Sequence, residues 1–189
     1  SLSESQNRAA LARVAEMSPA DGQRMTIPLG FGKDPLVDGR QSTAASQIAR
    51  GVGRVLASLG LASISELPLP NGRRADVVAM SGKGEFWIVE IKSCVEDFRA
   101  DQKWPEYWDF CDRFFFAVDP AFPQELLPED VGLIVADRYG GEVVRPSMDL
   151  RMPAPRRRAM ALRFGRAAAA RLQALADPAL NLGTLLRGD

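Results

Sequence analysis

The sequence contains no histidine among its 189 residues. This absence excludes Ser-His-Asp and Cys-His catalytic centres, metal sites held by imidazole, and a histidine general base. Any catalysis must therefore depend on carboxylates, lysine, arginine, tyrosine or cysteine. The two cysteines, Cys94 and Cys111, lack the clustered spacing of a zinc site, and we expect both to be buried free thiols in a reducing cytoplasm.

The chain also lacks an excess of charge of either sign, because 24 Lys and Arg residues balance 24 Asp and Glu residues. No global basic field therefore indicates nucleic-acid binding, although a local patch can still provide it. No apolar run reaches the length that spans a membrane, and residues 1–20 lack the pattern of a signal peptide. We expect a cytoplasmic protein without a membrane partner.

Apolar spacing and turn residues divide the chain into an N-terminal arm, residues 1–41, and a single domain, residues 42–189. In the arm, residues 5–16 predict a short helix and residues 18–41 a looped segment with several prolines and glycines. The domain is expected to contain a helix over 43–59, strands over 62–69, 73–80 and 85–92, a helix over 95–111 interrupted or bent near Pro105, strands over 113–119, 131–136 and 142–145, and a helix over 155–176. Hairpins followed by a helical crossover predict an α/β fold with a mixed central sheet flanked by helices.

The most informative residues are Asp76, Glu90 and Lys92, which lie at the ends of two predicted strands. Side chains alternate along a strand, so Glu90 and Lys92 share one face. A five-residue loop, 81–85, would place Asp76 opposite Glu90, and a three-residue loop, 81–83, would place it opposite Ile88. A loop of two or four residues would turn Asp76 to the other face.

If the three side chains meet, their chemistry suits hydrolysis of a phosphodiester bond. Asp76, Glu90 and the backbone carbonyl of Ile91 offer the hard oxygen ligands that Mg²⁺ or Mn²⁺ binds. The metal polarises the scissile phosphate and lowers the pKa of a bound water, and Lys92 holds that water or offsets negative charge. The simpler interpretation is a local Glu90–Lys92 ion pair with Asp76 in a structural salt bridge, since an E-x-K triple is common by chance.

The placement of these residues resembles the PD-(D/E)XK nuclease superfamily, in which Asp76 and Glu90 match the two acids and Lys92 the lysine. That resemblance implies a restriction-endonuclease-like αβββαβ core over about residues 43–119. The segments 74–78, 89–93 and 101–118 are closer still to the bacterial MmcB-related DNA-repair proteins, over about residues 40–165. The narrower resemblance implies a role in DNA repair, DNA as a partner, and a metal-dependent nuclease that cuts it.

One feature departs from the superfamily, many of whose members carry a metal-binding acid in the first core helix. The predicted helix over 43–59 has no acid, and Gln47 or Glu66 are the candidate substitutes. A catalytically degraded module that binds nucleic acid or a repair partner without cleaving is therefore the alternative function.

Residues that could contact nucleic acid surround the predicted site: Gln47, Arg50, Arg73, Arg74 and Lys103. Trp104 and Trp108 could stack on bases, but we favour their packing against the sheet. The sequence leaves open a homodimer, the DNA structure recognised, and endonuclease or exonuclease action.

Overall fold

The fold was analysed in a computed structural model, which describes residues 43–101 and 103–179. The helix expected over residues 5–16 and the arm that contains it lie outside the described residues. Six strands form one mixed sheet in the order β1-β2-β3-β4-β5-β6. Neighbours pair antiparallel from β1 to β3, parallel from β3 to β5, and antiparallel between β5 and β6. The sheet is therefore mixed, as the sequence predicts.

The order of elements follows the sequence expectation closely. The elements are α2 (Thr43–Ser58), β1 (Ala62–Pro68), β2 (Arg74–Met80), β3 (Phe86–Ile91), α3 (Val95–Ala100), the 3-10 helix η1 (Trp104–Phe110), β4 (Arg113–Val118), the 3-10 helix η2 (Gln124–Leu126), β5 (Gly132–Ala136), β6 (Gly141–Arg145) and α4 (Ala154–Ala176). From α2 to β4 this is an αβββαβ core. The strand β6 is the edge strand expected over 142–145.

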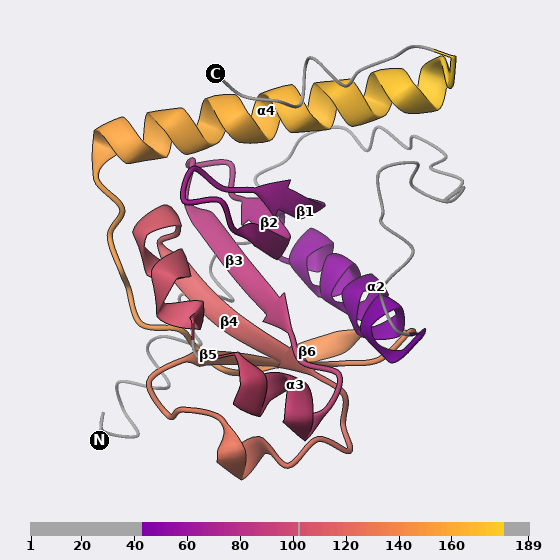
Figure 1. The fold of residues 1–189 in the computed structure, drawn as a ribbon, viewed down its shortest axis with the longest axis vertical. Coiled ribbons are helices and arrows are strands. Elements are labelled where there is room, and N and C mark those ends of the chain that lie inside the picture. The colour runs from indigo at the N-terminus through magenta and orange to yellow at the C-terminus, as the bar shows by residue number, and fades with distance from the viewer. Residues whose placement is uncertain (1–42, 102, 180–189) are drawn as a thin grey trace.

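The two faces of the sheet carry separate apolar clusters. Helix α2 covers one face, where Ile48, Val52 and Leu56 pack on residues such as Trp87 and Phe115. The other face is covered by η1 and α4, whose contributions include Tyr107, Met160 and Phe164. Figure 1 shows α4 crossing the top of the view above β1 and β2, and α2 beside the sheet. All six residues of β3 are buried, which makes β3 the central strand.

The β2–β3 hairpin has the five-residue loop that places Asp76 opposite Glu90. Met80 pairs with Phe86 and Val77 with Val89, so the loop is 81–85. The loop closes through Ser81, whose N–H donates to the carbonyl of Glu85 and whose Oγ accepts the Glu85 N–H. Gly84 adopts φ +77°, a left-handed conformation that glycine adopts without strain. The turn chemistry therefore fixes the register of the site.

The helix expected over 95–111 is interrupted near Pro105, and its second part is a 3-10 helix. Helix α3 ends at Ala100, Asp101 is extended, and the chain resumes as the 3-10 helix η1 with Pro105 in its first turn. Proline has no N–H to donate, so it suits the start of a helix and not its interior. Because α3 ends before Asp101, the side chain of Asp101 does not point where a continuous helix would place it.

Tryptophan packing in η1 follows the expectation. The ring of Trp104 stacks on that of Phe114 at 5.8 Å between centroids, and Trp108 packs on the same cluster. The cysteines are both free, but the expectation of burial is wrong for one of them: Cys111 is buried, and Cys94 is exposed at the N-terminal end of α3.

An ion pair with a buried carboxylate joins α4 to the residue that precedes β4. The carboxylate of Asp112, which is 4% exposed, accepts the N–H groups of Phe86 and Met152. It also accepts two bonds of 2.6 Å from the guanidinium of Arg157 in α4. Four donors thus satisfy one buried carboxylate, and they hold the long C-terminal helix against the sheet.

Candidate active site

Asp76 and Glu90 meet where the main-chain ladder between β2 and β3 ends. The last recorded pair is Val77 with Val89, and one more step of that register sets Asp76 opposite Glu90. Side-chain oxygens then replace main-chain acceptors. Oε1 of Glu90 accepts the N–H of Asp76 at 3.1 Å, and Oδ2 of Asp76 accepts the N–H of Ile91 at 2.8 Å. Each carboxylate is therefore held by the backbone of the opposite strand.

Burial and mutual repulsion make these two carboxylates costly to ionise. Glu90 is 4% exposed and Asp76 is partly buried. Desolvation raises the pKa of Glu90 well above its usual value, and the nearby charge of Asp76 raises it further. Desolvation also raises the pKa of Asp76, although the Ile91 N–H and the positive charge of Lys92 oppose this effect. A bound cation would relieve the repulsion.

Lys92 lies beside this pair, but its recorded hydrogen bond goes elsewhere. Its ammonium, on a side chain 8% exposed, donates to Oδ2 of Asp101 at 2.5 Å. The same Nζ lies 5.9 Å from the centre of the Phe116 ring. Burial tends to raise the pKa of Asp101, but the hydrogen bond from Lys92 and another from the Lys103 N–H outweigh it and lower the pKa. The carboxylate of Asp101 is thus held in its charged form.

Asp101 is a site residue that the sequence argument missed. The segment Asp101-Gln102-Lys103 has the D-x-K spacing of an acid and a lysine, and this spacing was the only signal for Asp101. A continuous helix would have turned these two side chains to different faces. Because α3 ends at Ala100, Asp101 is free of the helix and reaches Lys92. The Pro105 next to this segment is the sequence feature that could have indicated the break.

Tyr107 of η1 borders the site from the apolar side. Its hydroxyl donates to the carbonyl of Arg74 at 3.2 Å. Burial raises the pKa of Tyr107, and the negative charges of Glu90 and Asp76 add to this shift. From the sequence, Tyr107 is one of the aromatic residues that could stack on bases. In the structure its ring belongs to the apolar cluster on the face of the sheet that η1 covers.

The two substitutes for the missing helix acid lie in different places. Glu66 lies on β1 opposite Asp76 of β2. The strand pairs on either side of it join Leu67 to Ala75 and Ser65 to Val77. It is 5% exposed, adopts φ +50°, and has Oε2 3.6 Å from a guanidinium nitrogen of Arg74. Gln47 is exposed on α2, which packs on the other face of the sheet. Glu66 is therefore the nearer of the two to the carboxylate pair, and its charge raises the pKa of Asp76.

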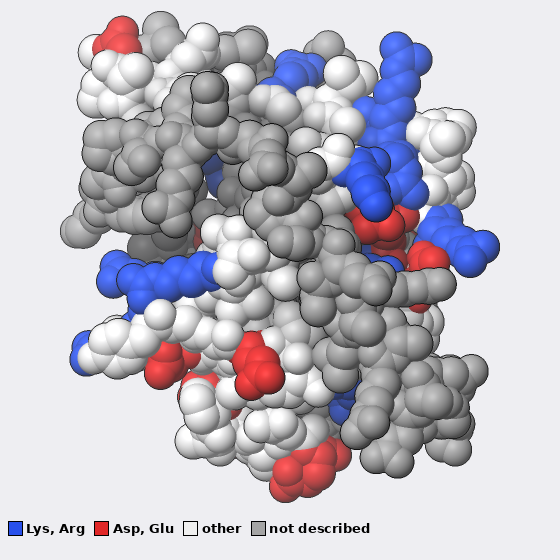
Figure 2. All heavy atoms as spheres, turned by 180° about the vertical axis from the view of Figure 1, so that it is seen from behind, with Lys and Arg blue, Asp and Glu red and all other residues white. Residues whose placement is uncertain are grey.

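The basic residues expected to contact nucleic acid differ in their exposure and in their hydrogen-bond partners. Arg73 forms two hydrogen bonds to the carboxylate of Glu106, at 2.7 and 3.0 Å. Arg74 has a side chain that is 52% exposed, and Arg50 and Lys103 are exposed. On the face drawn in Figure 2, the described basic and acidic side chains lie in small separate groups and form no continuous basic field.

The oxygen atoms available for a metal come from few side chains. Within residues 43–101 and 103–179, no group of three or more histidine, cysteine, aspartate or glutamate side chains is arranged to hold a metal ion. The donors that converge are the Asp76 and Glu90 carboxylates, with the main chain of Ile91 between Glu90 and Lys92. Two carboxylates suit a cation that keeps several of its waters, as Mg²⁺ does.

The order of elements, the mixed sheet and the position of the paired acids define an α/β protein with a restriction-endonuclease-like αβββαβ core. A solved structure with this fold is the SPO1766 protein of unknown function from Silicibacter pomeroyi, at 44% identity and a TM-score of 0.70. The match covers 73% of this chain and 94% of that chain. The family model described as DNA repair protein MmcB-like matches residues 32–179. The chain therefore belongs to the MmcB-like family of DNA repair proteins.

No curated protein matches the chain. Among the helices that the structure describes, none combines the length and the apolar character needed to cross a membrane.

Proposed function

We propose that the protein is a metal-dependent nuclease that hydrolyses phosphodiester bonds of DNA during repair. The observation that carries this proposal is the meeting of Asp76 and Glu90 at the end of the β2–β3 ladder, with Lys92 directly after the last residue of β3. This arrangement supports assignment to the PD-(D/E)XK superfamily, with these three residues in its acid, acid and lysine positions. Membership of a DNA repair family supports DNA as the substrate.

The chemistry of the donor set fits Mg²⁺ or Mn²⁺. Carboxylate and carbonyl oxygens are the ligands that these hard cations bind, and neither histidine nor thiolate is needed. Desolvation, together with a neighbouring negative charge, raises the pKa values of Asp76 and Glu90, and a bound cation would favour their ionised forms. We infer that Asp76, Glu90 and the Ile91 carbonyl hold the cation, and Glu66 is the candidate for a further carboxylate.

Each residue then has a separate task in the reaction. A bound Mg²⁺ would polarise the scissile phosphate and make a water molecule acidic enough to attack it. Asp76 and Glu90 bind and orient this centre through oxygens that the backbone already fixes. Lys92 donates a hydrogen bond to the attacking water or to the charge that develops on the phosphate, and the hydrogen bond to Asp101 holds its ammonium in place. Tyr107 excludes bulk water from the apolar side.

Cleavage of a labelled DNA substrate tests the proposal. Asp76→Asn and Lys92→Met should lower metal-dependent cleavage about a hundredfold or more, with little change in circular dichroism. Asp109→Asn, at an exposed acid of η1, is the matched control and should cleave like the wild type. Equal cleavage by purified wild type and Asp76→Asn would refute the proposal.

A second candidate function follows from α2, which carries no acidic residue. A nuclease core without that ligand could bind DNA or a repair partner and not cut. Calorimetric titration with Mn²⁺ separates the two functions. Binding that Asp76→Asn removes favours the nuclease, whereas no Mn²⁺ binding by the wild type favours the binding module.

A further inference from the structure

The turn between β5 and β6 presents an aromatic side chain to solvent without a structural reason. Tyr139 is 66% exposed, which is the largest value among the exposed large apolar side chains of the described residues. Its recorded side-chain contacts are with its neighbour Arg138, whose guanidinium lies 4.6 Å from the ring centre and donates to the hydroxyl. The ring thus takes no part in either core cluster.

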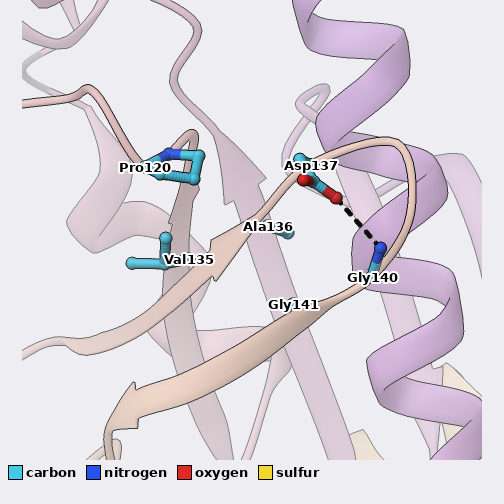
Figure 3. Close-up of a pocket in the computed structure, with 6 residues that line it drawn as sticks. All are labelled: Pro120, Val135, Ala136, Asp137, Gly140 and Gly141. Carbon is cyan, nitrogen blue, oxygen red and sulfur yellow. Dashed lines mark hydrogen bonds between the residues drawn. The ribbon is translucent and has the colours of Figure 1, made fainter.

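The main chain beneath this side chain is held firmly. Oδ1 of Asp137 accepts the N–H groups of Tyr139 and Gly140, at 2.7 and 3.1 Å, and Figure 3 shows the bond to Gly140. From α2, the guanidinium of Arg54 donates to the carbonyls of Arg138 and Tyr139, at 3.1 and 2.6 Å. The turn is therefore fixed from two sides, and a fixed turn presents Tyr139 in a defined place.

Close contact between α2 and this turn depends on a glycine. A Cβ atom at Gly51 would lie 2.1 Å from the carbonyl oxygen of Asp137 and 2.5 Å from that of Gly140. The helix can therefore approach the turn only because residue 51 has no side chain. On the exposed side of the same helix lie Gln47 and Arg50, which continue the surface from the turn along α2.

A shallow pocket of about 170 Å³ adjoins the turn. It is lined by Pro120, Val135, Ala136, Asp137, Gly140 and Gly141. Pro120 and Asp137 follow the carboxyl ends of β4 and β5, and β3 ends at the same edge of the sheet because these three strands are parallel. Strand spacing sets the lateral distance from β3 to this turn at about 10–15 Å. Helix α2 lies on the face opposite Asp76 and Glu90, so a nucleic-acid strand that contacts both places passes around this edge of the sheet.

Arginine side chains are the groups near the turn that can bind an anionic ligand. Arg50, Arg54 and Arg138 contribute three positive charges, and Asp119, Asp137 and Glu142 contribute three negative ones. The Asp137 charge is already engaged by two backbone N–H groups. A tyrosine with neighbouring arginines is the combination that stacks on an unpaired base and binds the adjacent phosphates.

We propose that Tyr139, Arg138 and the exposed side of α2 form a binding surface for single-stranded DNA, or for unpaired nucleotides in a repair substrate, at the edge of the sheet that carries Asp76 and Glu90. The inference rests on the proposed function because it names the substrate class of that site. Stacking has no access to the base faces of an intact duplex, so the surface selects DNA with unpaired bases.

Fluorescence anisotropy with a fluorescein-labelled single strand, measured in EDTA so that no cleavage occurs, tests the proposal. Tyr139→Ala should weaken binding of the single strand about tenfold and change binding of the matching duplex less. Tyr139→Phe, which keeps the ring, should bind like the wild type. Arg138→Ala should weaken binding and reduce its dependence on salt, whereas Arg158→Ala on α4 should not.

The outcomes separate this inference from the proposed nuclease. Equal affinity of Tyr139→Ala and wild type for the single strand would overturn the inference, and so would the absence of measurable single-strand binding by the wild type. Loss of binding in Tyr139→Phe would refute stacking as its basis. Cleavage by the wild type and its loss in Asp76→Asn are measured independently, so either conclusion can fail alone. Thermal melting of Tyr139→Ala should match the wild type because the ring packs on no core residue.

Discussion

Lys92 and Asp101 form a hydrogen-bonded ion pair of 2.5 Å between the end of β3 and the residue that follows α3. The side chain of Lys92 is 8% exposed and that of Asp101 is 24% exposed, so the two charges compensate each other in a poorly solvated place. The partner of the proposed catalytic lysine is therefore neither Asp76 nor Glu90. Both of these carboxylates remain available for a cation.

Removal of Asp101 should leave the Lys92 ammonium buried without its partner. We expect Asp101→Ala to lower the free energy of unfolding by about 1–3 kcal/mol, measured by urea denaturation. Lys92→Met alone and the double variant complete a double-mutant cycle. In the double variant the loss should be smaller than the sum of the single losses. Additive losses would show that the two side chains do not act as a pair.

Replacement of Glu90 should stabilise the protein when no metal is added. Glu90→Gln keeps an oxygen that can accept the Asp76 N–H and removes a charge that burial makes unfavourable. We expect a higher free energy of unfolding than that of the wild type at pH 7 in EDTA. Glu125→Gln, at an exposed glutamate of η2, is the control and should change stability little. A Glu90→Gln protein less stable than the wild type would contradict the repulsion between the two acids.

The raised pKa of Glu90, caused by burial and by repulsion from Asp76, predicts that the stability of the folded protein depends on pH. The pKa of Glu90 is higher in the folded protein than its usual value of 4.5, so the folded state binds this proton more tightly than the unfolded state. The Glu90 contribution to stability is present below the usual value and is lost as the pH rises through the folded pKa. Thermal melting in EDTA should therefore show that acidification from pH 7 towards this range destabilises the wild type less than it does Glu90→Gln. An equal response of the two proteins would rule out this contribution.

Two aspartates three residues apart should differ strongly in their effect on stability. Asp112 is buried and accepts four hydrogen bonds, two of them from Arg157. Asp112→Ala should cost about 3–5 kcal/mol because it leaves a partly buried guanidinium and two N–H groups without their acceptor. Asp109 forms an exposed pair with Arg156, so Asp109→Ala should cost at most about 1 kcal/mol. Similar losses in the two variants would contradict a structural role for the buried pair.

Two glycines of α2 should also respond in opposite directions. Gly51→Ala should cost about 1–3 kcal/mol because the new methyl group would overlap the main chain of the β5–β6 turn. Gly53→Ala meets no atom within 4 Å and should add about 0.5–1 kcal/mol through its helix propensity. Thermal melting should show a lower melting temperature for Gly51→Ala than for the wild type and a higher one for Gly53→Ala. A stabilised Gly51→Ala protein would show that the turn is not packed against the helix.

The hairpin that carries Asp76 and Glu90 was predictable because its signals are local. Strand alternation fixes the side of Glu90 and Lys92, and the glycines of the 81–85 segment restrict the loop to a few lengths. The sequence left two loop lengths open, and the pairing of Met80 with Phe86 selects the longer one. The buried, non-alternating strand over 113–118 was equally clear, since both of its faces are apolar.

What the sequence determined by itself is the order of elements, the two acids and the lysine at their strand ends, and the exclusion of every histidine-based site. Only the tertiary structure decided that Lys92 pairs with Asp101 and that Tyr139 stands exposed on a turn held by α2. Those contacts join segments that are distant in sequence or separated by a helix break, and local propensity carries no information about them. Their geometry depends on how the helices pack on the two faces of the sheet.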